Sequence, residues 1–198
     1  MNPVVRRAAN VVSLALNPSV LTGVFFGVLA AGFALPGRRL DLFIACLLFA
    51  TVLPVGSLFV LHALGHLSDI EMRVRTERGL VYLVCLASYL AGTVVLVLMR
   101  APWQLWGMMS LHLPTTAMLA LLTRTSKVSV HTMVIAGICG AAVVFFGPSA
   151  LPGLALLPIA AWARWAAGAH SIAELVTGAT LGMTLSGGGA WLLSSLLG

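Results

Sequence analysis

Long apolar runs, separated by short polar or glycine- and proline-containing breaks, make up most of this chain. A membrane-spanning helix needs about 20 largely apolar residues, and most of the runs reach that length. None of them alternates apolar and polar residues with a period of two, so membrane strands are not expected. Inside a bilayer the backbone must satisfy its own hydrogen bonds, and each run is therefore predicted to be a helix. The predicted helices cover residues 20–36, 40–64, 79–99, 103–123, 131–148, 149–165 and 171–195.

The composition indicates a protein embedded in a membrane rather than a soluble domain. Hydrophobic residues make up 60% of the 198 residues, charged residues only 8%, and the mean hydropathy is +1.06. Soluble domains are roughly half apolar and about a quarter charged. Because the runs at 20–36 and 149–165 are short for a span, we expect six to seven crossings. The predicted fold is all-α, a polytopic transmembrane helix bundle that forms a single domain over residues 20–198.

The first 19 residues have a different character. Arg6 and Arg7 precede a moderately apolar stretch that Asn17 and Pro18 interrupt, and no convincing signal-peptide cleavage site follows. We therefore expect residues 1–19 to form an amphipathic segment on the membrane surface.

The net charge of +6 restricts the possible partners. Eleven lysines and arginines are too few and too clustered for a nucleic-acid-binding surface. The lipid bilayer itself, anionic lipid or a phosphate group is a better match for them. Trp103, Trp106, Trp162 and Trp165 fall near predicted helix ends, which is typical of the aromatic belt at a membrane interface.

Polar residues gather in three segments that the predicted topology brings to one side of the membrane. Two helices separate residues 65–78 from 124–131, and two shorter ones separate residue 131 from residue 164. Charged groups at helix ends beside an apolar bundle suggest a functional site, whereas snorkelling under the positive-inside rule would explain only the basic residues. The polar residues on this side are Asp69, Glu71, Arg73, Arg75, Glu77, Arg78, Arg124, Lys127, Ser129, His131, Arg164, His170 and Glu174.

His170 and Glu174 stand four residues apart at the start of the last predicted helix. This spacing puts a carboxylate on the same helix face as an imidazole, one turn along. A carboxylate in that position can orient the ring and stabilise its cation, so that the imidazole could act as a nucleophile. A structural hydrogen bond is the alternative interpretation of such a pair.

The last polar segment resembles the third motif of the PAP2 superfamily, the type 2 phosphatidic acid phosphatases. That motif reads Ser-Arg, five residues, His, three residues, Asp, and this chain keeps both spacings from Arg164 to His170 and from His170 to Glu174. Ala163 stands in place of the serine, and Glu174 in place of the aspartate. The small-residue helix that follows is also similar.

Two further segments extend the resemblance, which covers roughly residues 40–190. The second motif, usually Pro-Ser-Gly-His, is similar to Val128-Ser129-Val130-His131, preceded by Lys127. The first, usually Lys, six residues, Arg-Pro, is matched loosely by the segment from Ser68 to Arg78. There we assign the terminal arginine to Arg78 and the role of the lysine to Arg75.

The resemblance implies a metal-independent lipid phosphatase that uses no cofactor. His170 would attack phosphorus and form a phosphohistidine, His131 would protonate the leaving alkoxide and later activate water, and Glu174 would hold the His170 ring. Phosphoryl transfer depends mainly on positioning and on stabilising charge, which arginine forks supply bidentately. The substrate's phosphate would be bound by Arg75, Arg78, Lys127, Ser129 and Arg164.

The expected substrate is a polyprenyl phosphate or diphosphate, or a phosphatidyl-type lipid, and the expected location is a bacterial or archaeal cell membrane. Two alternatives stay open. A catalytically degenerate member would bind lipid phosphate without hydrolysing it, and a small transporter would also carry charges within a helix bundle. His62 and His66 are four apart, but no third metal ligand stands at a recognisable spacing from them.

Overall fold

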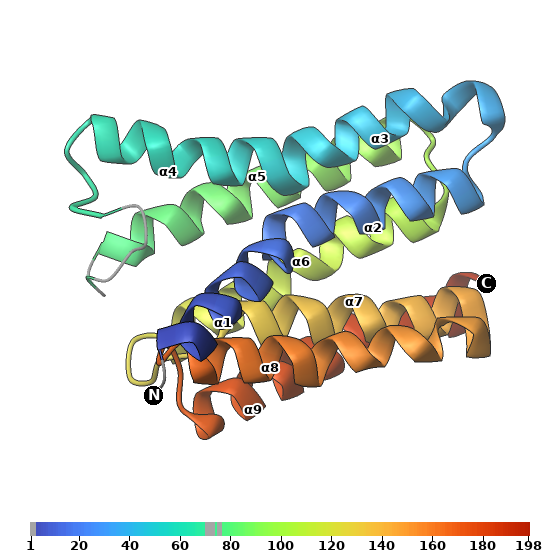
Figure 1. Ribbon diagram of the computed structural model, residues 1–198. Coiled ribbons are helices and arrows are strands. Elements are labelled where there is room, and N and C mark those ends of the chain that lie inside the picture. Colours follow the sequence, from blue (N-terminus) through green and yellow to red (C-terminus); the bar gives the residue numbers. More distant parts are fainter. Residues whose placement is uncertain (1–2, 70–73, 75–76) are drawn as a thin grey trace. The chain divides into compact units, whose positions relative to one another are not determined.

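The computed structural model describes residues 3–69, 74 and 77–198, and over these residues the chain is helical with no strand (Figure 1). The chain divides into two compact units. Unit 1 joins Met1–Leu21 to Ser126–Gly198, and unit 2 comprises Thr22–Thr125. The first 21 residues therefore belong to the same unit as the C-terminal third of the chain.

Unit 2 is built around the antiparallel pair α5 and α6, with α3 to α4 packed against α5 (Figure 1). The turn between α5 and α6 contains Arg100, whose φ of 53° is left-handed, followed by Pro102, which cannot donate a backbone hydrogen bond. The helical segments of unit 2 are α2 (Pro18–Phe33, which begins in unit 1), η1 (Pro36–Arg38), α3 (Arg39–Leu47), the π-helix η2 (Leu48–Val52), α4 (Leu53–Ala63), α5 (Arg78–Leu98) and α6 (Trp103–Leu122).

Unit 1 is built around α7, against which α8, α9 and the segment after α9 pack, while α1 packs against α8. Gly147 ends α7 with a φ of +69°, and the chain then returns along α7 as η4 and α8 (Figure 1). The helical segments of unit 1 are α1 (Pro3–Ala15), α7 (Val130–Phe146), the 3₁₀-helix η4 (Gly147–Ala155), α8 (Leu156–Ala166), α9 (Ile172–Leu181), the π-helix η5 (Gly182–Gly188) and α10 (Gly189–Leu197).

Glycines let α9 and η5 approach α7 closely. A β-carbon on Gly178 would collide with the backbone carbonyl oxygen of Ser129, and one on Gly182 would overlap the carbonyl oxygen of Met133. Such contacts bring backbones together at a distance that larger side chains prevent. They hold the first turn of α7 next to the first turns of α9, and this juxtaposition positions the polar residues of unit 1.

Five stretches of the described chain are long and apolar enough to cross a membrane. They are Pro3–Phe33, Pro36–Ala63, Arg78–Leu98, Trp103–Leu122 and Val130–Ala166. The prediction of an all-helical fold is confirmed, and the five stretches are consistent with an integral membrane protein. The last stretch has 37 residues and contains both α7 and α8, so it includes a reversal of direction. The count of six to seven spans stays a prediction.

Candidate functional site

Two serines begin the helices that carry the predicted histidines. Ser129 precedes α7, and its hydroxyl accepts a hydrogen bond of 3.5 Å from the backbone N–H of Thr132. Ser171 precedes α9, where its hydroxyl accepts from the backbone N–H of Glu174 at 3.3 Å while the Glu174 carboxylate accepts from the Ser171 N–H at 3.2 Å. This reciprocal capping box fixes the start of α9. It also fixes the position of the Glu174 carboxylate beside His170.

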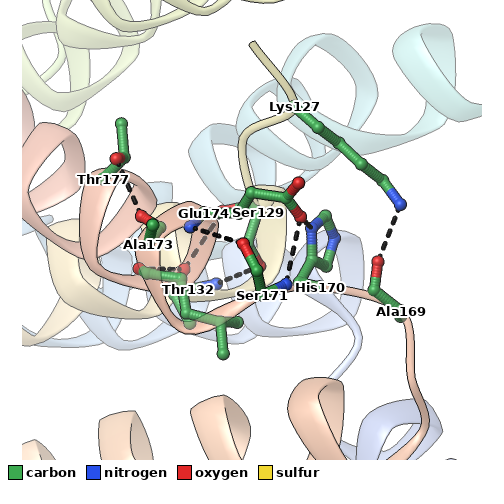
Figure 2. A network of polar contacts seen from close by, with 10 residues as sticks. Lys127, Ser129, Thr132, Ala169, His170, Ser171, Ala173, Glu174 and Thr177 are labelled. Atoms are coloured by element: carbon green, nitrogen blue, oxygen red, sulfur yellow. Dashed lines mark hydrogen bonds and ion pairs between the residues drawn. The ribbon is translucent and has the colours of Figure 1, made fainter.

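Three long-range hydrogen bonds join these two helix starts (Figure 2). The Ser129 N–H donates to the Glu174 carbonyl at 3.3 Å, and the Thr132 hydroxyl donates to the Leu175 carbonyl at 2.9 Å. The Lys127 ammonium donates to the Ala169 carbonyl at 2.7 Å. Residues 127–132 and 169–175 therefore form one continuous cluster.

His170 and Glu174 form the central pair of this site. His170 Nδ1 lies 2.9 Å from Glu174 Oε2, with the imidazole side chain 8% exposed and the carboxylate side chain 26% exposed (Figure 2). Because an ionised carboxylate only accepts, Nδ1 must carry the proton of this bond. The neutral ring then keeps a lone pair on Nε2, which is the state that a nucleophile requires.

The surroundings keep this imidazole neutral. Burial lowers the pKa of His170 below its ordinary value of 6.5; the hydrogen bond that the ring donates to Glu174 raises this pKa, and the nearby charges of Lys127 and Arg164 lower it. Burial disfavours the charged form, and neighbouring cations act in the same direction. His170 is therefore an uncharged base at neutral pH, close to the positive charges of Lys127 and Arg164.

Arg164 and His131 are joined to the site through α1. The Arg164 Nη1 donates a hydrogen bond of 3.0 Å to the Ser13 hydroxyl, and the His131 ring lies near the backbone of Ser13. His131 also lies within electrostatic range of both Arg164 and His170. Ser13 itself is 7% exposed. One buried residue of α1 thus adjoins a predicted phosphate-binding residue, Arg164, and a predicted catalytic residue, His131.

Sequence reasoning missed Ser13, because it treated residues 1–19 as a separate surface segment. A single serine in an amphipathic stretch gives no signal of a partner 151 residues away. Ser13 also supplies a hydroxyl near Arg164, where the third motif usually has a serine of its own. Ala163, which replaces the motif's serine, is fully buried, and the hydroxyl that contacts Arg164 comes from α1 instead.

The predicted first-motif residues belong to a different part of the chain. Arg75 lies outside the described residues, and Arg78 is the half-buried first residue of α5 in unit 2. The Glu77 carboxylate accepts hydrogen bonds of 2.9 Å from the N–H and the hydroxyl of Ser68. The site assembled in unit 1 therefore consists of Lys127, Ser129, His131, Arg164, His170 and Glu174, with Ser13 added.

The site of unit 1 suits an anion. Lys127 and Arg164 supply positive charge, two imidazoles lie close by, and the amino ends of α7 and α9 add the partial positive charge of helix dipoles.

Among the described residues, no group of three or more His, Cys, Asp or Glu side chains could hold a metal ion. His62 Nδ1 donates to the Leu67 carbonyl at 2.9 Å, which is a structural role.

Comparison with known proteins gives no match: no family model, no curated protein and no solved structure is significantly similar to this chain.

Proposed function

We propose that this chain is an integral membrane phosphatase that removes phosphate from a lipid phosphate through a phosphohistidine intermediate. One observation carries the proposal: the His170 ring is oriented by Glu174 at 2.9 Å and lies in the field of Lys127 and Arg164. An oriented neutral imidazole beside fixed cations is the arrangement that attack on a phosphate monoester or diphosphate requires. The three-motif resemblance to the PAP2 superfamily supports the same assignment.

In the proposed reaction, His170 Nε2 attacks phosphorus in line with the leaving oxygen. The new P–N bond forms as the P–O bond to the lipid breaks, and protonated His131 gives its proton to the departing alkoxide. Neutral His131 then takes a proton from water, whose oxygen attacks phosphorus and releases phosphate from His170. Arg164 and Lys127 neutralise charge on the equatorial oxygens, and Ser129 is assigned to the phosphate site with them.

A lipid substrate fits the place of this site in the chain. Its residues lie at the starts of α7 and α9 and near the end of α8, next to long apolar segments. We propose that these helix ends lie at one membrane–water boundary of a bundle with six to seven spans. A substrate with a phosphate head and an apolar tail, such as a polyprenyl phosphate, a polyprenyl diphosphate or a phosphatidyl lipid, would reach such a site from within the bilayer.

The test is phosphate release from a panel of lipid phosphates by the purified full-length chain, with EDTA present throughout. We expect wild type and the control variant His66→Ala to release phosphate from at least one lipid, and His170→Ala and His131→Ala to release none above background. His66 is exposed and stands outside the site. Retained activity in His170→Ala would exclude this residue as the nucleophile, and loss of wild-type activity with EDTA would exclude a metal-independent reaction.

A lipid-phosphate binder without catalysis is the second candidate. Buried Ala163 in place of the motif's serine favours it, because the third motif then lacks one phosphate hydrogen-bond donor of its own. This candidate predicts saturable binding of a lipid phosphate by the wild type with no phosphate release from any lipid in the panel. Uptake of a solute into vesicles without hydrolysis would instead support the small transporter.

A further inference from the structure

An apolar groove runs between α8 and α9 in unit 1. Its volume of about 460 Å³ falls in the range of roughly 300–1,000 Å³ that ligand pockets occupy. Trp162 and Trp165 of α8 line one side, and Ile172 and Val176 of α9 line the other. These four side chains are between 41% and 67% exposed, so the groove is open along its length to the surroundings of the helices.

The base of the groove offers no hydrogen-bonding group to an occupant. It is formed by Leu175, which is 5% exposed, and by Thr132 of α7, which is fully buried. The Thr132 hydroxyl donates to the Leu175 carbonyl at 2.9 Å. A polar ligand would lose its hydrogen bonds to water on entering such a groove, whereas a hydrocarbon chain would not.

One end of the groove adjoins the polar site. Trp165 directly follows Arg164, Ile172 stands two residues after His170, and Thr132 directly follows His131. The end of α8 and the start of α9 thus bring cationic and imidazole groups to the same end at which the apolar walls begin. An occupant complementary to both features has an anionic head and an apolar tail.

We propose that this groove binds the hydrocarbon tail of the lipid whose phosphate lies at Lys127, Arg164 and His170. The inference rests on the proposed function for its class of ligand, but it does not depend on hydrolysis. Ordinary membrane lipid could also lie against α8 and α9, but it would do so without preference for a phosphate headgroup. Headgroup preference therefore separates the two occupants.

The tryptophans in the groove walls report its occupant directly. A variant with Trp103→Phe, Trp106→Phe and Trp191→Phe keeps only Trp162 and Trp165, and its emission is followed in phosphatidylcholine vesicles. The probe is phosphatidic acid with brominated acyl chains, compared with brominated phosphatidylcholine at the same mole fraction. We expect saturable quenching by the phosphatidic acid, half-maximal at about a tenfold lower mole fraction than for the phosphatidylcholine.

A second variant supplies the control for the tryptophan positions. It keeps only Trp191 on α10, which is 64% exposed and stands outside the groove. We expect the two brominated lipids to quench Trp191 equally. Equal quenching of Trp162 and Trp165 by the two lipids would overturn the proposal, since the groove would then hold bulk lipid only.

Filling the groove provides an independent arm in the otherwise wild-type chain. Ala161→Leu and Ala179→Leu place larger side chains in the walls, and Ala155→Leu makes the same change at an exposed position outside the groove. We expect the first two to weaken binding of brominated phosphatidic acid about tenfold and the control to leave it unchanged. Unchanged binding in both wall variants would contradict the proposal.

The outcomes also separate this proposal from the phosphatase proposal. Headgroup-selective quenching without phosphate release would overturn the phosphatase and leave the groove assignment standing. Phosphate release, together with equal quenching of Trp162 and Trp165 by the two brominated lipids, would overturn the groove assignment and leave the phosphatase proposal standing.

Discussion

The guanidinium of Arg164 donates a 3.0 Å hydrogen bond to the hydroxyl of Ser13, which lies 151 residues earlier in the chain. This contact makes α1 part of the candidate site rather than a separate surface segment. The backbone of Ser13 also lies near the His131 ring, so the same residue adjoins a residue proposed to bind phosphate and the proposed proton donor.

Removing the Ser13 hydroxyl tests the contribution of α1. A hydrogen bond to a charged group contributes about 1.5–3 kcal/mol, so Ser13→Ala should weaken phosphate binding by about tenfold or more. The measurement is KM for lipid phosphate, with Ser149→Ala as the control, because the exposed Ser149 hydroxyl donates to the Phe146 carbonyl and stands outside the site. Ser13→Thr keeps the hydroxyl and should restore most of the affinity. An unchanged KM in Ser13→Ala would show that Arg164 holds its position without this contact.

Glu174 combines a structural and a proposed catalytic role, and Glu174→Gln separates them. The amide oxygen of glutamine can still accept from the Ser171 N–H, so the capping box and the start of α9 should persist. Loss of the negative charge should lower kcat by about 10²–10⁴-fold, the usual contribution of an acid–base partner. Helix content and thermal stability should stay close to wild type. A kcat within a few-fold of wild type would assign Glu174 to helix capping alone.

The pH profile depends on the lowered pKa of His170. We expect kcat/KM to fall on the acid side as pH drops below the ordinary histidine value of 6.5, where the folded enzyme begins to protonate His170, and to fall on the alkaline side as His131 loses the proton that it gives to the leaving alkoxide. Lys127→Met removes one of the charges that lower this pKa, so the acid limb should move to higher pH. An acid limb that stays in place, or that moves to lower pH, would contradict this electrostatic account.

The same shift affects stability with a definite sign. The pKa of His170 is lower in the folded chain than in the unfolded chain, so between the two values the unfolded chain binds more protons. Stability from this group is therefore fully present above pH 6.5 and is lost as pH falls towards the folded pKa. His170→Phe removes this group and should flatten that part of the profile of unfolding free energy against pH.

The close approach of η5 to α7 predicts a strong effect of one methyl group. A β-carbon on Gly182 would overlap the Met133 carbonyl oxygen, so Gly182→Ala should lower the free energy of unfolding in detergent by about 1–3 kcal/mol or more. Gly153→Ala is the matched control, because nothing lies within 4 Å of a β-carbon there. Equal stability of the two variants would mean that the helices separate at little cost.

The sequence predicted local features of the site better than distant ones. A spacing of four residues indicated that His170 and Glu174 share a helix face, and the two side chains are hydrogen-bonded at 2.9 Å. Apolar runs indicated the helices, because every buried backbone group in such a run must be paired. Both features follow from residues that are close in sequence, because they depend on the spacing along one helix or on the length of one apolar run.

Contacts between distant segments could not be predicted from spacing along the chain. The Ser13 contact depends on how α1 packs against α8, and the groove depends on the separation of α8 from α9. From the sequence, Trp162 and Trp165 fitted an interfacial belt, whereas in the structure both line the groove. Spacing along one helix does not fix the distance between two helices, which depends on small residues such as Gly178 and Gly182.

The central claim is a phosphoryl group carried on His170, and trapping that intermediate tests it most directly. Full-length protein is mixed with lipid phosphate labelled at phosphorus, with EDTA present, and is quenched in alkali, where phosphohistidine is stable. We predict label on wild type and on His66→Ala that is lost on acid treatment and maps to the peptide containing His170, with none on His170→Ala. Phosphate release from the lipid without any such label on wild type, or equal label on His170→Ala, would contradict the account.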